Sequence, residues 1–178
     1  MFFKTTLLVA LAALSQAMPT TPAADTSAVA ACKPDDVHCI TDSMLFSSSM
    51  TQFLTLRSQN YHSPPLTYKS DGCSVPKLFV DEFQLIDKDR PYGRYNFINA
   101  CYRHDFGCNN YKKQKRFTKT NKKPIDEKFK TDLLAICDAQ FADPRTPQPA
   151  GATLDDCKHI ANIYYLGAAV YFGGIQGE

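Results

Sequence analysis

His104 and Asp105 are the residues best suited to chemistry, because they lie side by side in a segment with a helical pattern. On a helix that advances about 100° per residue, Phe97, Cys101, His104, Asp105 and Cys108 share one stripe about 100° wide. A stripe of that width normally faces a core. Histidine can take up a proton near neutral pH, and a carboxylate can bind a hard cation. This pairing points to a buried reactive site.

The two side chains project about 100° apart, so each can serve a different partner. We expect Asp105 to hold a cation together with the loop residue Asp71 and a neighbouring backbone carbonyl. Asp126, on a helix antiparallel to this one, is the best candidate to orient His104. Carboxylate, carbonyl and water ligands suit Ca²⁺, held weakly by only two carboxylates. The expected chemistry is ester hydrolysis, in which His104 takes a proton from water while the cation polarises the ester oxygen.

Each partner assignment has a simpler alternative. The Asp-Gly pair of the loop can be an ordinary turn. The cation-loop interpretation gains weight if Cys73 bonds Cys101, because that bond would hold the loop one helical turn from His104. Asp126 can serve the dipole of its own helix. Asp132, farther along the same segment, can form a surface salt bridge.

The first residues have the pattern of a secretory signal peptide. Residues 1–17 contain Lys4, an apolar run over 7–14 and a small-residue end at 15–17. The alternative, a membrane anchor, requires a longer apolar run. Residues 18–31 are predicted to be a disordered leader or pro-segment. The remaining 32–178 form one domain with enough length for a core.

Secretion implies that most of the seven cysteines form disulfides. Three disulfides and one odd thiol allow on the order of a hundred connectivities. Cys101 and Cys108 are about 10 Å apart along a helix and cannot bond each other. Cys32 and Cys39 close a short span. A zinc site is the alternative, but no C-x2-C pair supports it. The cysteines are Cys32, Cys39, Cys73, Cys101, Cys108, Cys137 and Cys157.

The periodicity predicts an all-α domain stapled by disulfides and built around two antiparallel helices. Two short helices are expected between Asp36 and Arg57, with a serine cap from the run at 47–49. A further short helix is possible at 79–86. The central helix begins near Phe97.

Two helices are expected after the central one. Pro124 is predicted to start the first of them. The second is capped by Thr153 or Asp155, and it is apolar nearly all round, so we expect it to be buried or to line a channel. Cys137 and Cys157 flank the loop between these helices and could join them.

Seven cations lie within residues 112–123, which contain no acid, although the net charge of the chain is only +2. They indicate either a solvated loop or a positively charged surface that binds an anionic one. Nucleic acid is a third option, but no nucleic-acid motif accompanies the run. The seven are Lys112, Lys113, Lys115, Arg116, Lys119, Lys122 and Lys123.

Three segments together carry a resemblance to secreted phospholipases A2 of the bacterial and fungal type. They are Cys101-Tyr-Arg-His-Asp-Phe-Gly107 with Asn110-Tyr111, Asp71-Gly-Cys-Ser74, and the helix from Pro124 to Asp132. The similarity extends from about Thr41 to Val170. It implies an all-α fold, dependence on Ca²⁺ and hydrolysis of the sn-2 ester of glycerophospholipids.

By position, the resemblance implies that His104 is the general base and Asp126 its orienting partner. Asp71, the Gly72 carbonyl and Asp105 would bind calcium.

The resemblance also implies two disulfides, Cys73–Cys101 and Cys137–Cys157. A Cys32–Cys39 bond, or a pairing with Cys108, would be additional. Cys108 stands where the family often has an aromatic residue, and the segment before the central helix is longer than in short bacterial members.

The sequence therefore predicts a secreted phospholipase A2 that acts on a phospholipid membrane or micelle surface. It would be a monomer with neither a protein partner nor nucleic acid. The alternative is a secreted, non-catalytic protein that binds membranes through calcium and basic residues.

Overall fold

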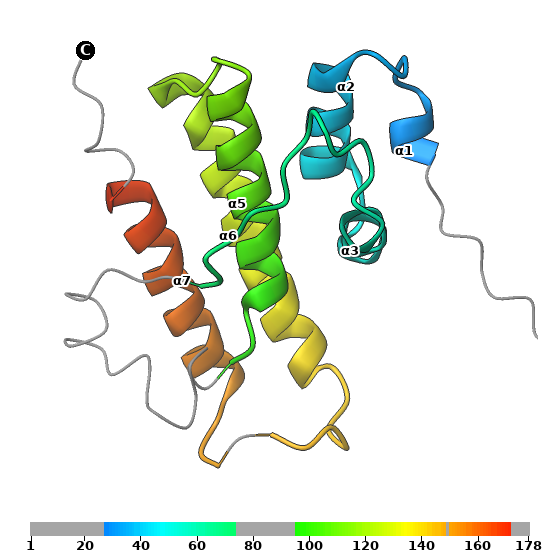
Figure 1. Cartoon of the computed structure of the whole chain (residues 1–178). Coiled ribbons are helices and arrows are strands. Elements are labelled where there is room, and N and C mark those ends of the chain that lie inside the picture. Colours follow the sequence, from blue (N-terminus) through cyan, green and yellow to red (C-terminus); the bar gives the residue numbers. More distant parts are fainter. Residues whose placement is uncertain (1–26, 74–94, 149, 172–178) are drawn as a thin grey trace, which may run out of the picture.

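The computed structural model describes residues 27–73, 95–148 and 150–171, and these residues form helices and connecting loops without a strand (Figure 1). The prediction of an all-α fold is confirmed. The elements are α1 (Ser27–Ala30), α2 (Val37–Asp42), the π-helical turn η1 (Ser43–Ser47), α3 (Met50–Ser58), α5 (Ile98–Lys113), α6 (Lys119–Phe141) and α7 (Leu154–Tyr171).

Helices α5 and α6 lie side by side and run in opposite directions (Figure 1). Arg103 on α5 contacts Asp132 on α6, and His104 contacts Asp126, so residue numbers rise on one helix as they fall on the other. Helix α7 packs on α6, again antiparallel, and a disulfide joins Cys137 to Cys157. The predicted antiparallel pair is thus part of a three-helix layer.

Helix α5 is buried on nearly every side. Its Phe106 packs against Phe53 of α3, with ring centroids 5.5 Å apart. On another side, Phe97 at its N-terminus meets Tyr164 of α7 at 5.4 Å. A Cβ placed on Gly107 would meet the Leu45 side chain at 2.9 Å, so the glycine permits close approach of η1. The predicted stripe is buried as expected except for the half-buried Asp105, and other faces of the helix are covered too.

The two short N-terminal helices are confirmed. Ser49 caps α3 through a capping box, because its hydroxyl accepts from Gln52 N while the Gln52 side chain accepts from Ser49 N. Ser48 is extended and separates η1 from α3. Helix α1 forms within the segment predicted to be a leader and buries Val29. The signal peptide and the possible helix at 79–86 lie outside the described residues.

The predicted start of α6 at Pro124 is wrong. The helix begins at Lys119, and the Thr118 side chain caps it by accepting from Asn121 N at 3.2 Å. Pro124 lies inside the helix on an exposed side. It cannot bond the carbonyl of Thr120, but Thr120 is itself exposed, which keeps that cost small. The basic run is therefore the end of α5, a turn and the start of α6.

The expectation that α7 is buried all round is also wrong, whereas its alternative, that α7 lines a channel, stays a prediction. Cys157, Ala161 and Tyr164 face the core, whereas Leu166 and Val170 are 49% and 65% exposed. Isolated apolar side chains on a surface are common. No helix in the described part of the chain has the length and apolar character needed to cross a membrane.

All three disulfides suggested by the sequence are present. Cys73–Cys101 and Cys137–Cys157 match the pairs implied by the resemblance, and Cys32–Cys39 closes the short N-terminal span. Cys108 is a buried thiol.

Candidate active site

Two adjacent asparagines of α5 hold the chain that leads into the predicted cation loop. Asn110 accepts from the Thr67 backbone N–H at 3.0 Å and donates to the Thr67 carbonyl at 2.8 Å. Asn109 donates to the carbonyl of Lys69 at 3.0 Å. Beyond the loop, the bond from Cys73 to Cys101 ties it again to α5. Both ends of the loop are therefore fixed on the helix that carries His104 and Asp105.

The loop brings Asp71 and Gly72 beside Asp105. The Ser70 hydroxyl donates to Asp105 Oδ2 at 2.5 Å and accepts from Gly72 N at 3.0 Å. Gly72 has φ of +84°, a conformation that favours glycine. Burial raises the pKa of Asp105, and the nearby charge of Asp71 raises it further, although the Ser70 hydrogen bond opposes both. The negative charges of the Asp71 and Asp105 carboxylates therefore repel each other.

This arrangement suits a hard cation, because its side chains and carbonyls offer oxygen ligands and a bound cation would relieve the repulsion between Asp71 and Asp105. Within the described ranges, no three His, Cys, Asp or Glu residues are grouped to hold a metal ion. A cation here would rely on two carboxylates, carbonyl oxygens and water. Weak binding of the kind seen in extracellular calcium modules is expected.

His104 and Asp126 form a buried hydrogen bond between α5 and α6. His104 Nε2 lies 3.0 Å from Asp126 Oδ1, and the two residues are 6% and 5% exposed. Phe129 packs against the imidazole, with ring centroids 4.5 Å apart. The antiparallel pairing predicted from the sequence therefore brings these two residues together. A histidine held by a carboxylate in this way is suited to general base catalysis.

Lys122 is a member of this cluster that the sequence analysis missed. Its Nζ donates to Asp126 Oδ2 and, at 3.0 Å, to the carbonyl of Ala168 on α7. Lys122 is only 4% exposed, so it does not belong to a solvated basic loop. The sequence does contain a pattern that indicates this contact: Lys122 and Asp126 are four residues apart, which places both on one face of a helix. The incorrect start at Pro124 hid that relation.

Cys108 lies one turn after His104, with its Sγ 3.7 Å from His104 Nε2. The pKa of His104 is raised to about 9. Burial is the largest single effect and lowers this pKa, but the charge of Cys108, and hydrogen bonds to Asp126 and Cys108, raise it by more. Cys108 therefore raises the proton affinity of His104.

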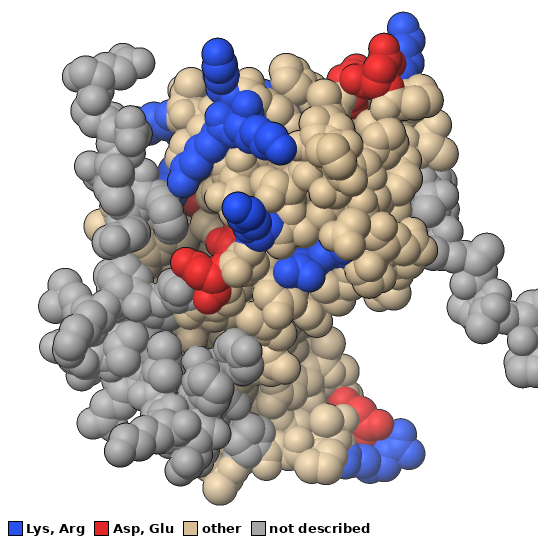
Figure 2. Space-filling model, viewed as in Figure 1, with Lys and Arg blue, Asp and Glu red and all other residues tan. Residues whose placement is uncertain are grey.

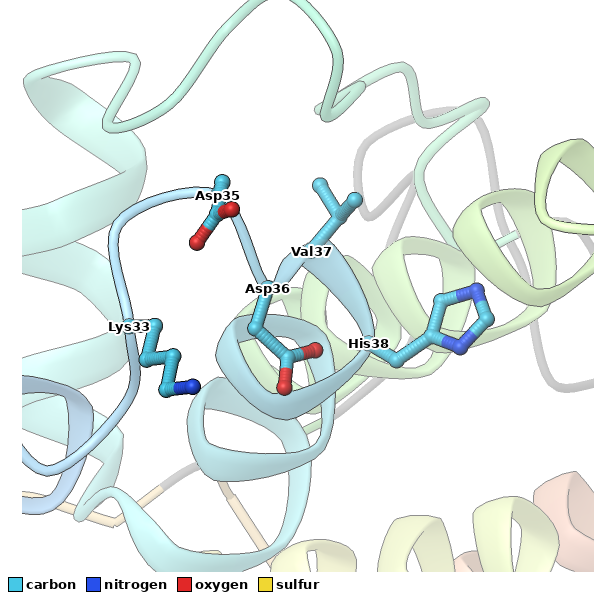
Figure 3. Close-up of a pocket in the computed structure, with 5 residues that line it drawn as sticks. All are labelled: Lys33, Asp35, Asp36, Val37 and His38. Carbon is cyan, nitrogen blue, oxygen red and sulfur yellow. The ribbon is translucent and has the colours of Figure 1, made fainter.

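A surface hollow of about 390 Å³ lies away from this cluster, beside the Cys32–Cys39 disulfide (Figure 3). Asp36 is already used there as the cap of α2, since its carboxylate accepts from Cys39 N at 2.9 Å. The hollow contains none of the residues described above. It is lined by Lys33, Asp35, Asp36, Val37 and His38.

Comparison with known proteins identifies the family. Residues 41–173 match the model of the family described as prokaryotic phospholipase A2. The chain is 35% identical over 146 residues to a secretory phospholipase A2 of Arthroderma benhamiae, covering 79% of this chain and 85% of that protein. It is 32% identical over 164 residues to a secretory phospholipase A2 of Beauveria bassiana, covering 92% and 72%. These secretory relatives and the three disulfides confirm the prediction of a secreted protein. The chain belongs to the prokaryotic phospholipase A2 family.

Proposed function

We propose that this protein is a secreted, calcium-dependent phospholipase A2. It would hydrolyse the sn-2 ester of glycerophospholipids to a fatty acid and a lysophospholipid, as a monomer on a membrane or micelle surface. The observation that carries the proposal is the buried His104–Asp126 hydrogen bond, one residue along α5 from a carboxylate that faces Asp71 and Gly72. The family and both curated relatives support the same activity.

Asp126 and His104 would perform the proton transfer. By accepting from Nε2–H, Asp126 holds His104 in the tautomer whose Nδ1 can take a proton. Nδ1 would remove a proton from water as that water attacks the ester carbonyl. The Asp126 carboxylate then stabilises the imidazolium that forms. Phe129 restrains the ring by packing on it.

Asp71, Asp105 and the Gly72 carbonyl are the groups that would hold calcium. Bound Ca²⁺ supplies a positive charge that polarises the ester carbonyl and stabilises its developing oxyanion. The protein's part is to keep the loop on α5, through Asn110 and the Cys73 disulfide.

The direct test is release of labelled fatty acid from phosphatidylcholine labelled at sn-2, using processed and fully oxidised protein. We expect activity with calcium and none with a chelator. Asp105→Asn should lower activity at moderate calcium by about 100-fold or more, with partial recovery at high calcium. Asp155→Asn, which changes an exposed aspartate of α7, is the matched control and should change activity less than twofold. Activity in chelator equal to that in calcium would refute calcium dependence.

Cys108 is expected to shift the pH dependence of this activity. Because its charge and hydrogen bond raise the pKa of His104, Cys108→Ala should lower that pKa. A general base works only when unprotonated, so activity falls as pH drops through its pKa. The acid limb of kcat/KM should therefore move to lower pH in Cys108→Ala, and also in Cys108→Ser. Profiles from pH 5 to 10 at saturating calcium check this, and a shift to higher pH would contradict it.

The basic end of the α5–α6 hairpin is suited to an anionic lipid surface. Figure 2 shows Lys and Arg side chains gathered over the end where α5 passes into α6. Lys115, Lys119 and Lys123 are exposed there. Arg116 is instead engaged with Asp42, at 2.7 Å, and stacks on Tyr111. The electrostatic role therefore falls to the exposed lysines.

Changing Lys115, Lys119 and Lys123 together to Gln should weaken binding to anionic vesicles by about 10-fold or more at low salt, at roughly 1 kcal/mol per cation. Binding to zwitterionic vesicles should change little. A control variant with Lys33, Arg145 and Lys158 changed to Gln loses the same charge from other surfaces. Equal losses in the two variants, or no dependence on salt, would exclude a localised docking surface.

A further inference from the structure

Lys122 is buried where three elements of the site meet. It lies in the second turn of α6, four residues before Asp126, and is 4% exposed. A lysine is almost never buried to this degree unless its charge is compensated. The compensation comes from Asp126 Oδ2 and from the carbonyl of Ala168 at 3.0 Å.

Asp126 is thereby held through both of its oxygens. Oδ1 contacts His104 Nε2 at 3.0 Å, and Oδ2 accepts from Lys122. A carboxylate with a single partner can rotate about its terminal bond, since such torsions are broad. With a second, charged donor on the other oxygen, the plane of the carboxylate is defined. The imidazole that bonds to it is therefore defined as well.

The contact with Ala168 extends this arrangement to α7. Ala168 is in the last turn of that helix, where carbonyls have no partner within the helix and carry partial negative charge. The Lys122 ammonium supplies the donor and the positive charge that such an end favours. Lys122 thus links the C-terminal end of α7 to the carboxylate of Asp126.

We propose that Lys122 is a positioning residue for the reaction: by holding the second oxygen of Asp126, it fixes the carboxylate that orients His104. The lysine touches neither substrate nor water in this role, and it acts only through Asp126. The inference rests on the proposed function. It predicts that loss of Lys122 lowers turnover while substrate binding is kept.

The test is Lys122→Met, which keeps the length of the side chain and removes the ammonium. With a short-chain, monomeric phosphatidylcholine at saturating calcium, kcat should fall about 10-fold or more and KM should stay within twofold. Lys130→Met is the matched control, because it removes a partly exposed cation from the same helix, away from the proposed site and docking surface, and both parameters should stay within twofold. Lys122→Arg, which keeps the charge and its donors, should restore part of kcat.

A double-mutant cycle distinguishes positioning from a general effect on the fold. If Lys122 acts through Asp126, Lys122→Met should change kcat less than twofold when Asp126 is already Asn. An equal loss in both backgrounds would overturn the proposal, and so would unchanged kcat in the single variant. Inactive wild-type protein would instead refute the proposed function itself.

Folding is checked by far-UV circular dichroism and thermal melting. If Lys122→Met does not fold, Lys122→Gln replaces it, because the amide keeps a donor without the charge. We then expect a smaller loss of kcat with the same dependence on Asp126. Failure of both variants to fold would make Lys122 a residue of the fold alone and overturn its assignment to the reaction.

Discussion

His104→Ala is expected to lower kcat for sn-2 hydrolysis by about 10²–10⁴, the usual contribution of a general base. The imidazole lies 3.0 Å from Asp126, the carboxylate proposed to orient it. Its loss should leave the loop at residues 70–72 in place, because that loop is held by Asn110 and by the Cys73–Cys101 bond. Initial rates with calcium and saturating lipid measure the effect.

The same variant separates an enzyme from a non-catalytic membrane-binding protein. Vesicle binding should be unchanged in His104→Ala, since the exposed lysines near the α5–α6 turn are unaffected. His159→Ala, which removes an exposed histidine of α7, is the control and should retain full activity. Turnover that survives the loss of His104 would show that another group is the base.

Arg103→Met is expected to destabilise the protein by about 3–5 kcal/mol, because it leaves a buried carboxylate without its main partner. Arg103 is 2% exposed, and its guanidinium donates to Asp132 Oδ2 at 2.8 Å and to Oδ1 at 2.5 Å. A third bond reaches the carbonyl of Ser48 at 2.7 Å. Arg103 therefore joins α5 and α6 to the extended residue between η1 and α3.

Urea unfolding of the oxidised protein measures this loss. Arg145→Met is the control, because Arg145 pairs with Asp143 at an exposed position, and its loss should leave the free energy of unfolding essentially unchanged. Replacing both partners, in Arg103→Met with Asp132→Leu, should recover much of the stability, since neither charge then remains buried alone. A single variant as stable as the wild type would show that Lys128, 3.1 Å from Asp132, compensates the charge by itself.

The pairing of Arg103 and Asp132 shows where local sequence patterns were insufficient. Asp132 has the spacing of an ordinary surface salt bridge on a helix, but the structure buries it. Its burial depends on Ser48 and on the faces of α5 covered by the N-terminal helices. Those contacts join residues more than 50 positions apart, and no short-range pattern reports them.

The candidate site itself followed from the sequence to a large extent. Helical spacing placed His104 and the half-buried Asp105 on one stripe, and antiparallel packing brought Asp126 to His104. The Asp71–Gly72 turn lies beside Asp105, as expected from a bond between the neighbouring Cys73 and α5. These relations depend on helix periodicity and covalent links, which the chain itself encodes locally. The catalytic and calcium-binding roles of these residues remain proposals.

The sequence by itself therefore determined the all-α class, the family and a set of candidate residues for the chemistry. Only the tertiary structure decided which charges are buried, because burial depends on elements that are distant along the chain. Lys122 reads as one more cation in a basic run, yet α7 covers it and supplies the Ala168 carbonyl. In an isolated helix the Lys122 ammonium would be solvated. Because α7 covers it, the ammonium is instead the second hydrogen-bond partner of Asp126.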